Sequence, residues 1–273
     1  MQGTGVGTLL RRWRSARRMS QLELSLAAEV SSRHLSFVET GRSRPSREMI
    51  LHLASALEVP LRERNALLHA GGYAPAYRET GLDEPSMAGM RDAVRLILRQ
   101  NEPYPAVALD RHWNLVMANA SYLGSLRRLL GDAFPDVPPL DVLPEPRVNT
   151  LEALFDPAGL RPHLGNWEEV ARSVLRRVKR EAALEGDARS AALVARLATY
   201  PGVAELGREP DPLGPQALVI PVELLFPGAT LRFFSTITTV GAPQDITLAE
   251  LRIEAFHPAD PETERVLRSA GVG

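Results

Sequence analysis

Between Thr8 and Gly71 the sequence repeats one pattern, in which a short stretch of apolar residues at helical spacing ends at a residue that stops a helix. Leu9, Leu10 and Trp13 begin the series, and their spacing places them on one side of a helix. Serine, glycine and proline residues divide the rest of the segment into four further stretches. The pattern therefore predicts five short helices.

The second and third of these helices carry the clearest signals. Ser20 and Glu23 have the spacing of a capping box at the start of the second helix. Leu22 and Leu26 lie four residues apart in that helix, so we expect both to face inward. The third helix follows a pair of serines and ends at Gly41. Two short helices joined by about four residues form the helix-turn-helix arrangement, whose second helix presents polar residues outward.

The segment SQLELSLAAEVSSRHLSFVETGRSRPS resembles the pattern SQ-x-x-L-A…VS-x-x-x-(I/L)S-x-x-E-x-G of lambda-repressor-like (XRE-type) DNA-binding domains. The resemblance implies that the second helix of the pair enters the major groove of DNA. It also implies that Arg42 and Arg44 contact phosphates, and that Gln21 contacts a phosphate and supports the base contacts. The DNA-binding residues that it implies are Gln21, Ser31, Ser32, Arg33, His34, Ser36, Phe37, Arg42 and Arg44.

Two of these residues have a second interpretation. Outside this motif, Arg33 reads better as a solvated surface arginine than as a DNA contact. Phe37 has a core residue as its alternative. Because Leu35 and Val38 already supply the buried side of the third helix, an exposed Phe37 suits contact with a thymine methyl group.

Other positions of the motif bear on structure. Arg14 and Glu39 match positions that form an ion pair in relatives. Glu29 stands in the turn where relatives usually have glycine, and Arg18 stands at another position that is often glycine. We expect Glu29 to adopt the left-handed conformation, at a cost of ~1 kcal/mol.

Charge is unevenly distributed along the chain. Residues 1–80 hold 12 Arg and 7 Glu, whereas residues 81–273 hold 20 basic and 26 acidic residues. This asymmetry indicates a polyanionic partner for the N-terminal domain alone. We expect double-stranded operator DNA as that partner. We also expect a homodimer, because one recognition helix reads only a few base pairs.

The chain changes character after residue 72. Residues 73–85 carry Gly and Pro without periodicity and predict a linker, after which Ser86 is expected to cap a helix. Ala106–Leu109 and Trp113–Ala118 read as two strands around a polar turn, and Asn119 as the N-cap of the next helix. Strand, turn, strand and capped helix is how a PAS domain opens.

Three segments, AGGYAPAYRETGL, PYPAVALDRHWNLVMANA and STITTVGAPQDITLAELRIEAFHPAD, resemble the MmyB-like transcription regulators. In that family an XRE-type head precedes a PAS-like ligand-binding domain, and the resemblance spans nearly the whole chain. It implies a small, fatty-acid-like effector held between the sheet and the helices.

The C-terminal part predicts a closing hairpin around the sequence GAPQ. Apolar and polar residues alternate with period two on both sides of it, which predicts an antiparallel sheet covered on one side. Two helices are expected before the hairpin, one capped by Asn166 and one preceded by Asp187. The first carries a basic row that we interpret as a solvated face, with a second nucleic-acid surface as the alternative: Arg172, Arg176, Arg177 and Arg180.

A ligand site in this domain would use the apolar face of the sheet, although a plain core would look identical. Arg111 and His112 are the basic residues nearest the turn and would meet a ligand carboxylate. The ligand-binding residues that we predict are Arg111, His112, Trp113, Leu115, Met117, Phe233 and Ile237.

Several kinds of chemistry find no support in the sequence. The chain has no cysteine, its six histidines lack metal-ligand spacing, and neither a G-x-S-x-G elbow nor a P-loop occurs. We therefore expect no metal, no catalytic residues, no enzyme activity and no cofactor beyond a bound apolar ligand. Two rival hypotheses remain: a C-terminal domain that docks a partner protein and binds no small molecule, and an enzyme fused to a DNA-binding head.

Location and fold class follow from the same observations. No apolar run reaches ~18 residues and no signal sequence is evident, so we expect no membrane contact and a cytoplasmic, nucleoid-associated protein. We predict a multi-domain chain: an all-α, lambda-repressor-like helix-turn-helix domain over residues 1–72, a linker over 73–85, and an α+β PAS-like domain with an antiparallel sheet over 86–273.

Overall fold

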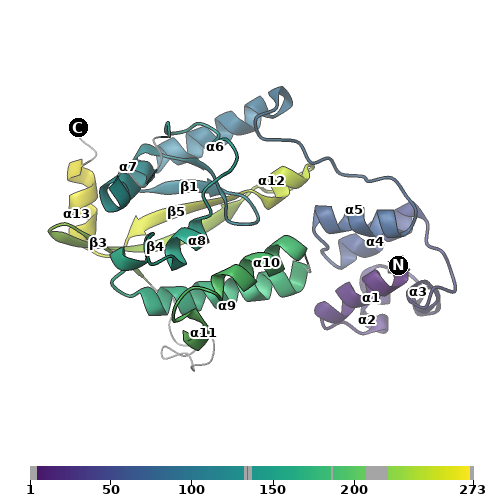
Figure 1. Ribbon diagram of the computed structural model, residues 1–273. Helices are drawn as coiled ribbons and strands as arrows, with labels where there is room; N and C mark the ends of the chain where they lie inside the picture. The colour runs from purple at the N-terminus through teal and green to yellow at the C-terminus, as the bar shows by residue number, and fades with distance from the viewer. Residues whose placement is uncertain (1–4, 132–133, 135–136, 186, 207–220, 271–273) are drawn as a thin grey trace. The chain divides into compact units, whose positions relative to one another are not determined.

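A computed structural model describes residues 5–131, 134, 137–185, 187–206 and 221–270 (Figure 1). The chain forms two compact units, and we describe each by itself. The head comprises residues up to Thr80 together with Gly241–Ala249, and the body comprises Gly81–Val240 together with the residues from Glu250 onward. The predicted boundaries at residues 73 and 86 stay a prediction.

The head contains the five helices that the sequence predicts. They are α1 (Val6–Ala16), α2 (Gln21–Ala27), α3 (Ser32–Glu39), α4 (Arg47–Ala56) and α5 (Leu61–Ala70). One core joins them, and its fully buried side chains include Leu10, Leu24 and Leu35. A Cβ on Gly7 would lie 2.1 Å from the carbonyl oxygen of Val38, so the close approach of α1 to α3 requires glycine there.

Each of the five head helices is followed by a residue with positive φ, two positions after its last residue. The residues are Arg18 (φ 56°), Glu29 (φ 49°), Gly41 (φ 74°), Glu58 (φ 49°) and Gly72 (φ 81°). In each case the next amide reaches back five residues to a helical carbonyl oxygen, as in a Schellman cap. The expectation that Glu29 is left-handed is therefore confirmed, and two further charged residues share this conformation, which favours glycine.

The inward face of α2 differs from the prediction. Leu22 and Leu26 were expected to be buried, but they are 60% and 70% exposed. Leu24 and Ala28, which are also four residues apart, fill the core instead. Because both pairs satisfy helical spacing, the sequence alone does not distinguish them.

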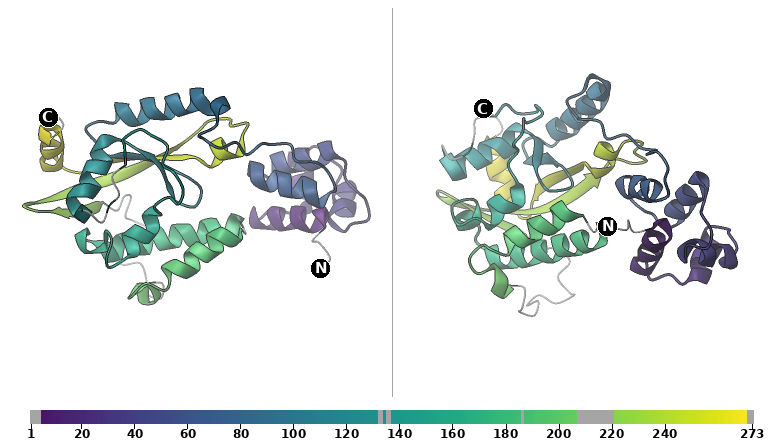
Figure 2. Two further views of the ribbon diagram at one scale, coloured as in Figure 1. Left: turned by 45° about the horizontal axis from the view of Figure 1, so that its top comes forward. Right: turned by 45° about the vertical axis from the view of Figure 1, so that its right-hand side comes forward.

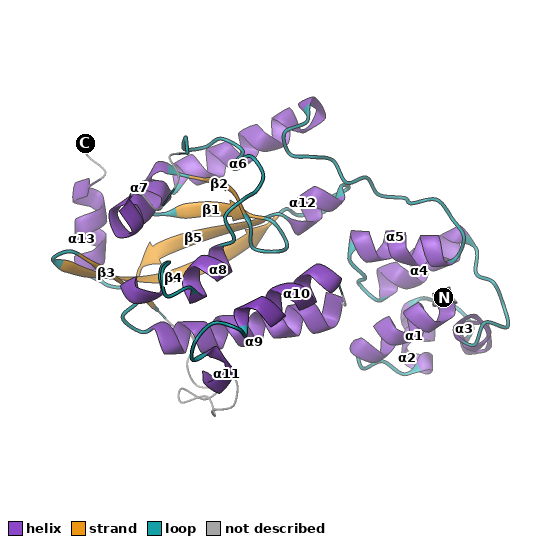
Figure 3. Ribbon diagram, in the orientation of Figure 1, coloured by secondary structure: helices purple, strands orange, loops and turns teal. Residues whose placement is uncertain are grey.

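The body is built on a five-stranded antiparallel sheet (Figure 3). Its strands are β1 (Ala106–Leu109), β2 (Leu115–Ala118), β3 (Val222–Phe226), β4 (Ala229–Thr239) and β5 (Arg252–Pro258). The strand order is β2-β1-β5-β4-β3, so the first two strands add to one side of the C-terminal three. An all-α head followed by an α+β domain with an antiparallel sheet confirms the predicted fold class.

Helices surround this sheet (Figure 2). The longer ones are α6 (Ala88–Gln100), α7 (Ala120–Leu130), α9 (Trp167–Glu185), α10 (Ala188–Leu197) and α13 (Pro261–Ala270). Short ones are η1 (Pro85–Met87), α8 (Thr150–Phe155), η3 (Arg161–His163), α11 (Val203–Leu206) and, in the β4–β5 connection, α12 (Ile246–Glu250). The main core joins β1 and β2 to α7, α8, α9 and α10.

The predicted one-sided covering of the sheet holds only for part of it. Every residue of β1 and β2 is buried, so both faces of these strands are covered. On β4, by contrast, Thr230, Arg232, Thr236 and Thr238 are exposed on one face, and Ser235 and Thr239 are exposed on the other.

Three local predictions need correction. Ser86 lies inside η1 and does not cap a helix, and Trp113 precedes β2. The predicted hairpin at GAPQ is not a tight turn, because α12 lies between β4 and β5. Asn119 does cap α7, and Asp187 caps α10, as expected.

The β4–β5 connection is held by the segment that follows α5. Thr80 Oγ1 donates to Asp245 Oδ2 (2.7 Å), and the Ile246 amide donates to the carbonyl oxygen of Arg78 (2.8 Å). The amides of Ala76 and Tyr77, in the same segment, donate hydrogen bonds to the side-chain oxygen of Asn65 on α5. The first part of the predicted linker is thus hydrogen-bonded both to α5 and to the β4–β5 connection. Within the described ranges, no helix is both long and apolar enough to cross a membrane.

Candidate functional site: the α3 surface and an apolar cavity

The start of α3 is set by a serine cap and presents polar side chains. Ser31 accepts a hydrogen bond from the His34 amide (3.1 Å), so its hydroxyl oxygen stabilises the helix start. Ser32 and Arg33 are exposed, and Phe37 is partly exposed beside them. Leu35 and Val38 are buried on the opposite side, so the core interpretation of Phe37 is not needed.

A buried ion pair fixes the position of α3 against α1 and α2. The Arg14 guanidinium binds the Glu39 carboxylate with two hydrogen bonds, 2.6 and 2.9 Å long, which confirms the predicted pair. Gln21 Nε2 donates to the same carboxylate (2.8 Å). Burial acts to raise the pKa of Glu39, but the hydrogen bonds from Arg14 and Gln21 hold it below its ordinary value.

The two arginines predicted to follow α3 differ in their surroundings. Arg42 is exposed. Arg44 Nη2 donates to the carbonyl oxygen of Gly71 (2.9 Å), and its guanidinium lies 5.6 Å from the ring centroid of Tyr73. Arg44 therefore links the α3–α4 loop to the end of α5, and a phosphate would have to compete with these contacts.

The body contains a cavity of about 250 Å³ between the sheet and the helices. Most side chains that line it are apolar and come from β1, β3, β4, β5, α7, α8 and α9. They include Val107, Leu109, Leu126, Leu154, Val174, Leu224, Phe233 and Phe256. This volume is slightly below the ~300–1,000 Å³ that is typical of sites for drug-sized ligands, so the cavity suits a slender apolar molecule.

Two arginines lie beside Trp113, and one of them, Arg177, also lines the cavity. The guanidinium groups of Arg177 and Arg252 lie over the Trp113 ring, 4.8 and 5.0 Å from its centroid. Both arginines also bind Glu181, at 3.0 and 2.9 Å. Glu254 from β5 completes the group of charged residues on this side.

Trp113 is held in an unusual backbone conformation. Its φ is +67°, a value that bulky residues rarely adopt. Asp110 stabilises this turn, because its carboxylate accepts hydrogen bonds from the amides of His112 (2.8 Å) and Asn114 (3.0 Å). Thr150 donates to the Trp113 carbonyl oxygen through its amide and its hydroxyl, both at 3.0 Å. Strained residues cluster at functional sites, so Trp113 is a candidate ligand contact.

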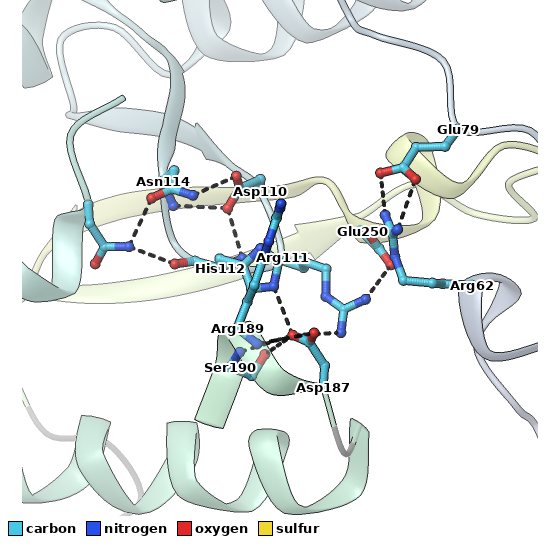
Figure 4. Close-up of polar contacts among 11 residues, drawn as sticks. Arg62, Glu79, Asp110, Arg111, His112, Asn114, Asp187, Arg189, Ser190 and Glu250 are labelled. Carbon is cyan, nitrogen blue, oxygen red and sulfur yellow. Dashed lines mark hydrogen bonds and ion pairs between the residues drawn. The ribbon is translucent and has the colours of Figure 1, made fainter. Parts of the chain in front are cut away.

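Arg111 and His112 do not reach this cavity. Arg111 donates to Glu250 (3.0 Å) and lies 3.4 Å from Asp187, while His112 Nε2 lies 3.0 Å from Asp187 (Figure 4). Asp187 also accepts from the amides of Arg189 and Ser190 (Figure 4). Burial acts against the Asp187 charge, but these hydrogen bonds hold its pKa well below the ordinary value. The two basic residues therefore tie the Trp113 turn to the start of α10.

The cavity brings together only part of the predicted ligand set. Trp113 and Phe233 line it. Leu115 and Met117 are buried on β2, away from the cavity wall, and Ile237 packs against the core without lining the cavity. Arg177 lines the cavity and Arg172 is 6% exposed, so the basic row of α9 is not one solvated face.

The polar lining residues Tyr122, Arg177 and Glu254 were missed from the sequence. The alternation in β5 placed Glu254 with the polar residues, which reads as a solvent face. In the structure Glu254 pairs with Ile237 of β4 and with Val107 of β1, so this face points into the cavity. The polar residues of β5, Glu254 among them, were the only sign in the sequence that this strand could contribute polar side chains to a site.

Together, a helix-turn-helix head and a body with an internal apolar cavity define a ligand-binding transcription regulator. Comparison with known families agrees in both parts: the model of the MmyB-like transcription regulator ligand binding domain matches residues 90–270, and the model named Helix-turn-helix domain matches residues 6–67. The chain therefore belongs to the MmyB-like transcription regulators.

Neither of the two matching families is a family of enzymes. A search of curated proteins finds no match to the chain. Among the described residues, no group of three or more His, Asp or Glu side chains could hold a metal ion.

Proposed function

We propose that the protein is a one-component regulator in which the head binds operator DNA as part of a homodimer and the body binds a small, fatty-acid-like effector. A regulator of this kind acts where the chromosome is, so the proposal places it in the cytoplasm at the nucleoid. The body has a sheet with helices around a cavity, an arrangement that we propose to be PAS-like, and the cavity supports an effector site.

The apolar cavity is the observation that carries the proposal. Its wall is mostly aliphatic and aromatic, whereas a few side chains are polar, among them Arg177, which lies over the Trp113 ring, and Glu254. A linear acyl compound matches this wall, because it consists of a long apolar chain that ends in one polar headgroup. Burying the chain supplies ~0.8 kcal/mol per CH₂ group, and the polar side chains orient the headgroup.

Two measurements on the full-length protein test the effector. Lipids extracted from natively purified protein and analysed by mass spectrometry should include an acyl compound. Decanoic acid should raise the thermal midpoint in a concentration-dependent way, since a ligand at 100 times its Kd adds ~2.7 kcal/mol of stability. A flat response across chain lengths, with no co-purified small molecule, would favour the rival proposal that the body docks a partner protein.

A matched pair of variants locates the effector. Ser173→Phe places a large side chain in the cavity wall on α9 and should remove the stabilisation by decanoic acid. Ser269→Phe adds the same side chain at an exposed position of α13 and should keep it. If Ser173→Phe keeps the response, the ligand binds elsewhere. Sedimentation of the protein with and without operator DNA tests the homodimer.

A further inference from the structure

One carboxylate belongs to the cavity wall itself. Glu254 lies on β5 with its side chain on the cavity face, beside Val107 of β1 and Ile237 of β4. Ser235 of β4, which also lines the cavity, donates a hydrogen bond to the Glu254 carboxylate. A ligand that fills the cavity therefore meets a carboxylate that has few polar partners.

The positive charges near Glu254 are already shared. Arg177 from α9 and Arg252 from β5 both act on Glu254, but both bind the Glu181 carboxylate directly. From α7, the Tyr122 ring lines the cavity, and its phenol interacts electrostatically with Glu254. Two arginines thus face two carboxylates, and an ionised ligand headgroup would add a third negative charge.

The titration of this group follows from its surroundings. Burial raises the pKa of Glu254, and this effect exceeds the opposing effects of Ser235, Arg177 and Arg252. Burial, together with the charge of Glu254, also raises the pKa of Tyr122. Like charges in an enclosed site disfavour each other, and two carboxyl groups in contact share one proton.

We propose that Glu254 selects the headgroup of the effector, so that the cavity binds an acyl ligand with an uncharged headgroup that shares one hydrogen with the Glu254 carboxylate. This inference rests on the proposed binding of an acyl chain in the same cavity. An alcohol or amide donates its own hydrogen to Glu254. A fatty acid, which is ionised at neutral pH, binds together with one proton taken from the solvent, and that proton lies between the two carboxyl groups.

Calorimetric titration of the full-length protein counts this proton. Decanoic acid and decan-1-ol are titrated at pH 6, 7.5 and 9, each in buffers of different ionisation enthalpy. Proton uptake with decanoic acid should rise with pH toward about one per ligand, and its affinity should then fall about tenfold per pH unit. Decan-1-ol should bind without proton uptake at each pH. If both ligands bind with no proton uptake at any pH, this inference alone is wrong.

The variant Glu254→Gln keeps the shape of the side chain and removes its charge. It should abolish the proton uptake with decanoic acid and strengthen the binding of the ionised acid relative to decan-1-ol. Glu264→Gln removes a carboxylate on α13 that pairs with Arg268, and it should behave as the wild type.

The wild-type titrations do not depend on how well a variant folds. If Glu254→Gln binds decanoic acid with the same proton uptake as the wild type, another group supplies the proton and the inference fails. If neither ligand binds the wild type, the proposed function fails first, and this inference fails with it.

Discussion

The guanidinium of Arg33 lies over the ring of Phe37, with Cζ 5.5 Å from the ring centroid. The two residues are one helical turn apart on α3, and both are predicted to contact DNA. A cation over an aromatic ring is attracted to it by ~0.5–1 kcal/mol at an exposed site. Arg33 is therefore partly ordered before DNA is bound, which reduces the entropy that it loses on binding.

The first prediction concerns the roles of two arginines in the head. Arg33→Ala should cost ~1–3 kcal/mol on an operator selected from random DNA, and it should relax the preference at one base position. Arg42→Ala should weaken binding to all sequences alike and lower the salt slope by about one. Binding to the operator and to its one-base variants, at several salt concentrations, distinguishes the two effects. An unchanged base preference in Arg33→Ala would make Arg33 a backbone contact.

The left-handed end of α2 gives the second prediction. Glu29 has a φ of 49°, which glycine adopts with less strain. Glu29→Gly should stabilise a fragment of residues 1–80 by ~0.5–1 kcal/mol, measured by urea denaturation. The fragment holds every residue of the head's hydrophobic core. Glu29→Ala is the matched variant and should not stabilise, because it keeps the strained Cβ.

The third prediction concerns acid stability. Because the pKa of Glu39 is lowered in the folded head, its ionisation adds stability that is complete above the unfolded value of ~4.3 and is lost as pH falls through the folded pKa. The urea midpoint of the fragment should therefore fall from pH 5 to pH 3. Glu39→Gln should be less stable at pH 7 and should lose less on acidification. An equal loss in both proteins would mean that other carboxylates dominate the acid transition.

Asn119 is the subject of the fourth prediction. Its side chain accepts from the amides of Ala106 and Tyr122 (both 3.0 Å) and donates to the carbonyl oxygens of Leu98 (3.2 Å) and Tyr104 (2.8 Å). The residue is fully buried, so Asn119→Ala leaves buried polar groups unpaired and should destabilise the body by at least ~2 kcal/mol. Asn119→Ser can keep the helix cap, so its thermal midpoint should lie between those of the wild type and Asn119→Ala. Equal midpoints for Ser and Ala would show that the cap contributes little.

Local rules predicted much of this protein because they act over a few residues. The caps at Ser20, Asn119 and Asp187 depend on short hydrogen bonds within one turn, and each is present. The conformation of Glu29 likewise follows from its place at a helix end. Spacing within a short motif was therefore a reliable guide at these positions, whereas the cap predicted at Ser86 is absent.

Features that depend on tertiary packing were not accessible in the same way. In α2 the pair Leu22 and Leu26 fits the helical period as well as Leu24 and its partner Ala28 do. Only packing against the other helices decides that Leu24 is buried. Glu254 reads as a solvent-facing residue until the register places it opposite Ile237. Arg177 reads as part of a solvated row until α9 is packed over the cavity. In each case a distant part of the chain decides which side is enclosed.

The position of Gly241–Ala249 limits how this protein can be recombined. This segment joins β4 to β5 in the body, yet it clusters with the head, where Asp245 binds Thr80. The chain therefore passes between the two units three times, at residues 80, 240 and 249. A chimera that exchanges residues 1–80 alone would leave the original Asp245 facing a foreign partner. A modular exchange of the DNA-binding part needs both pieces of sequence, so the two parts are expected to diversify together.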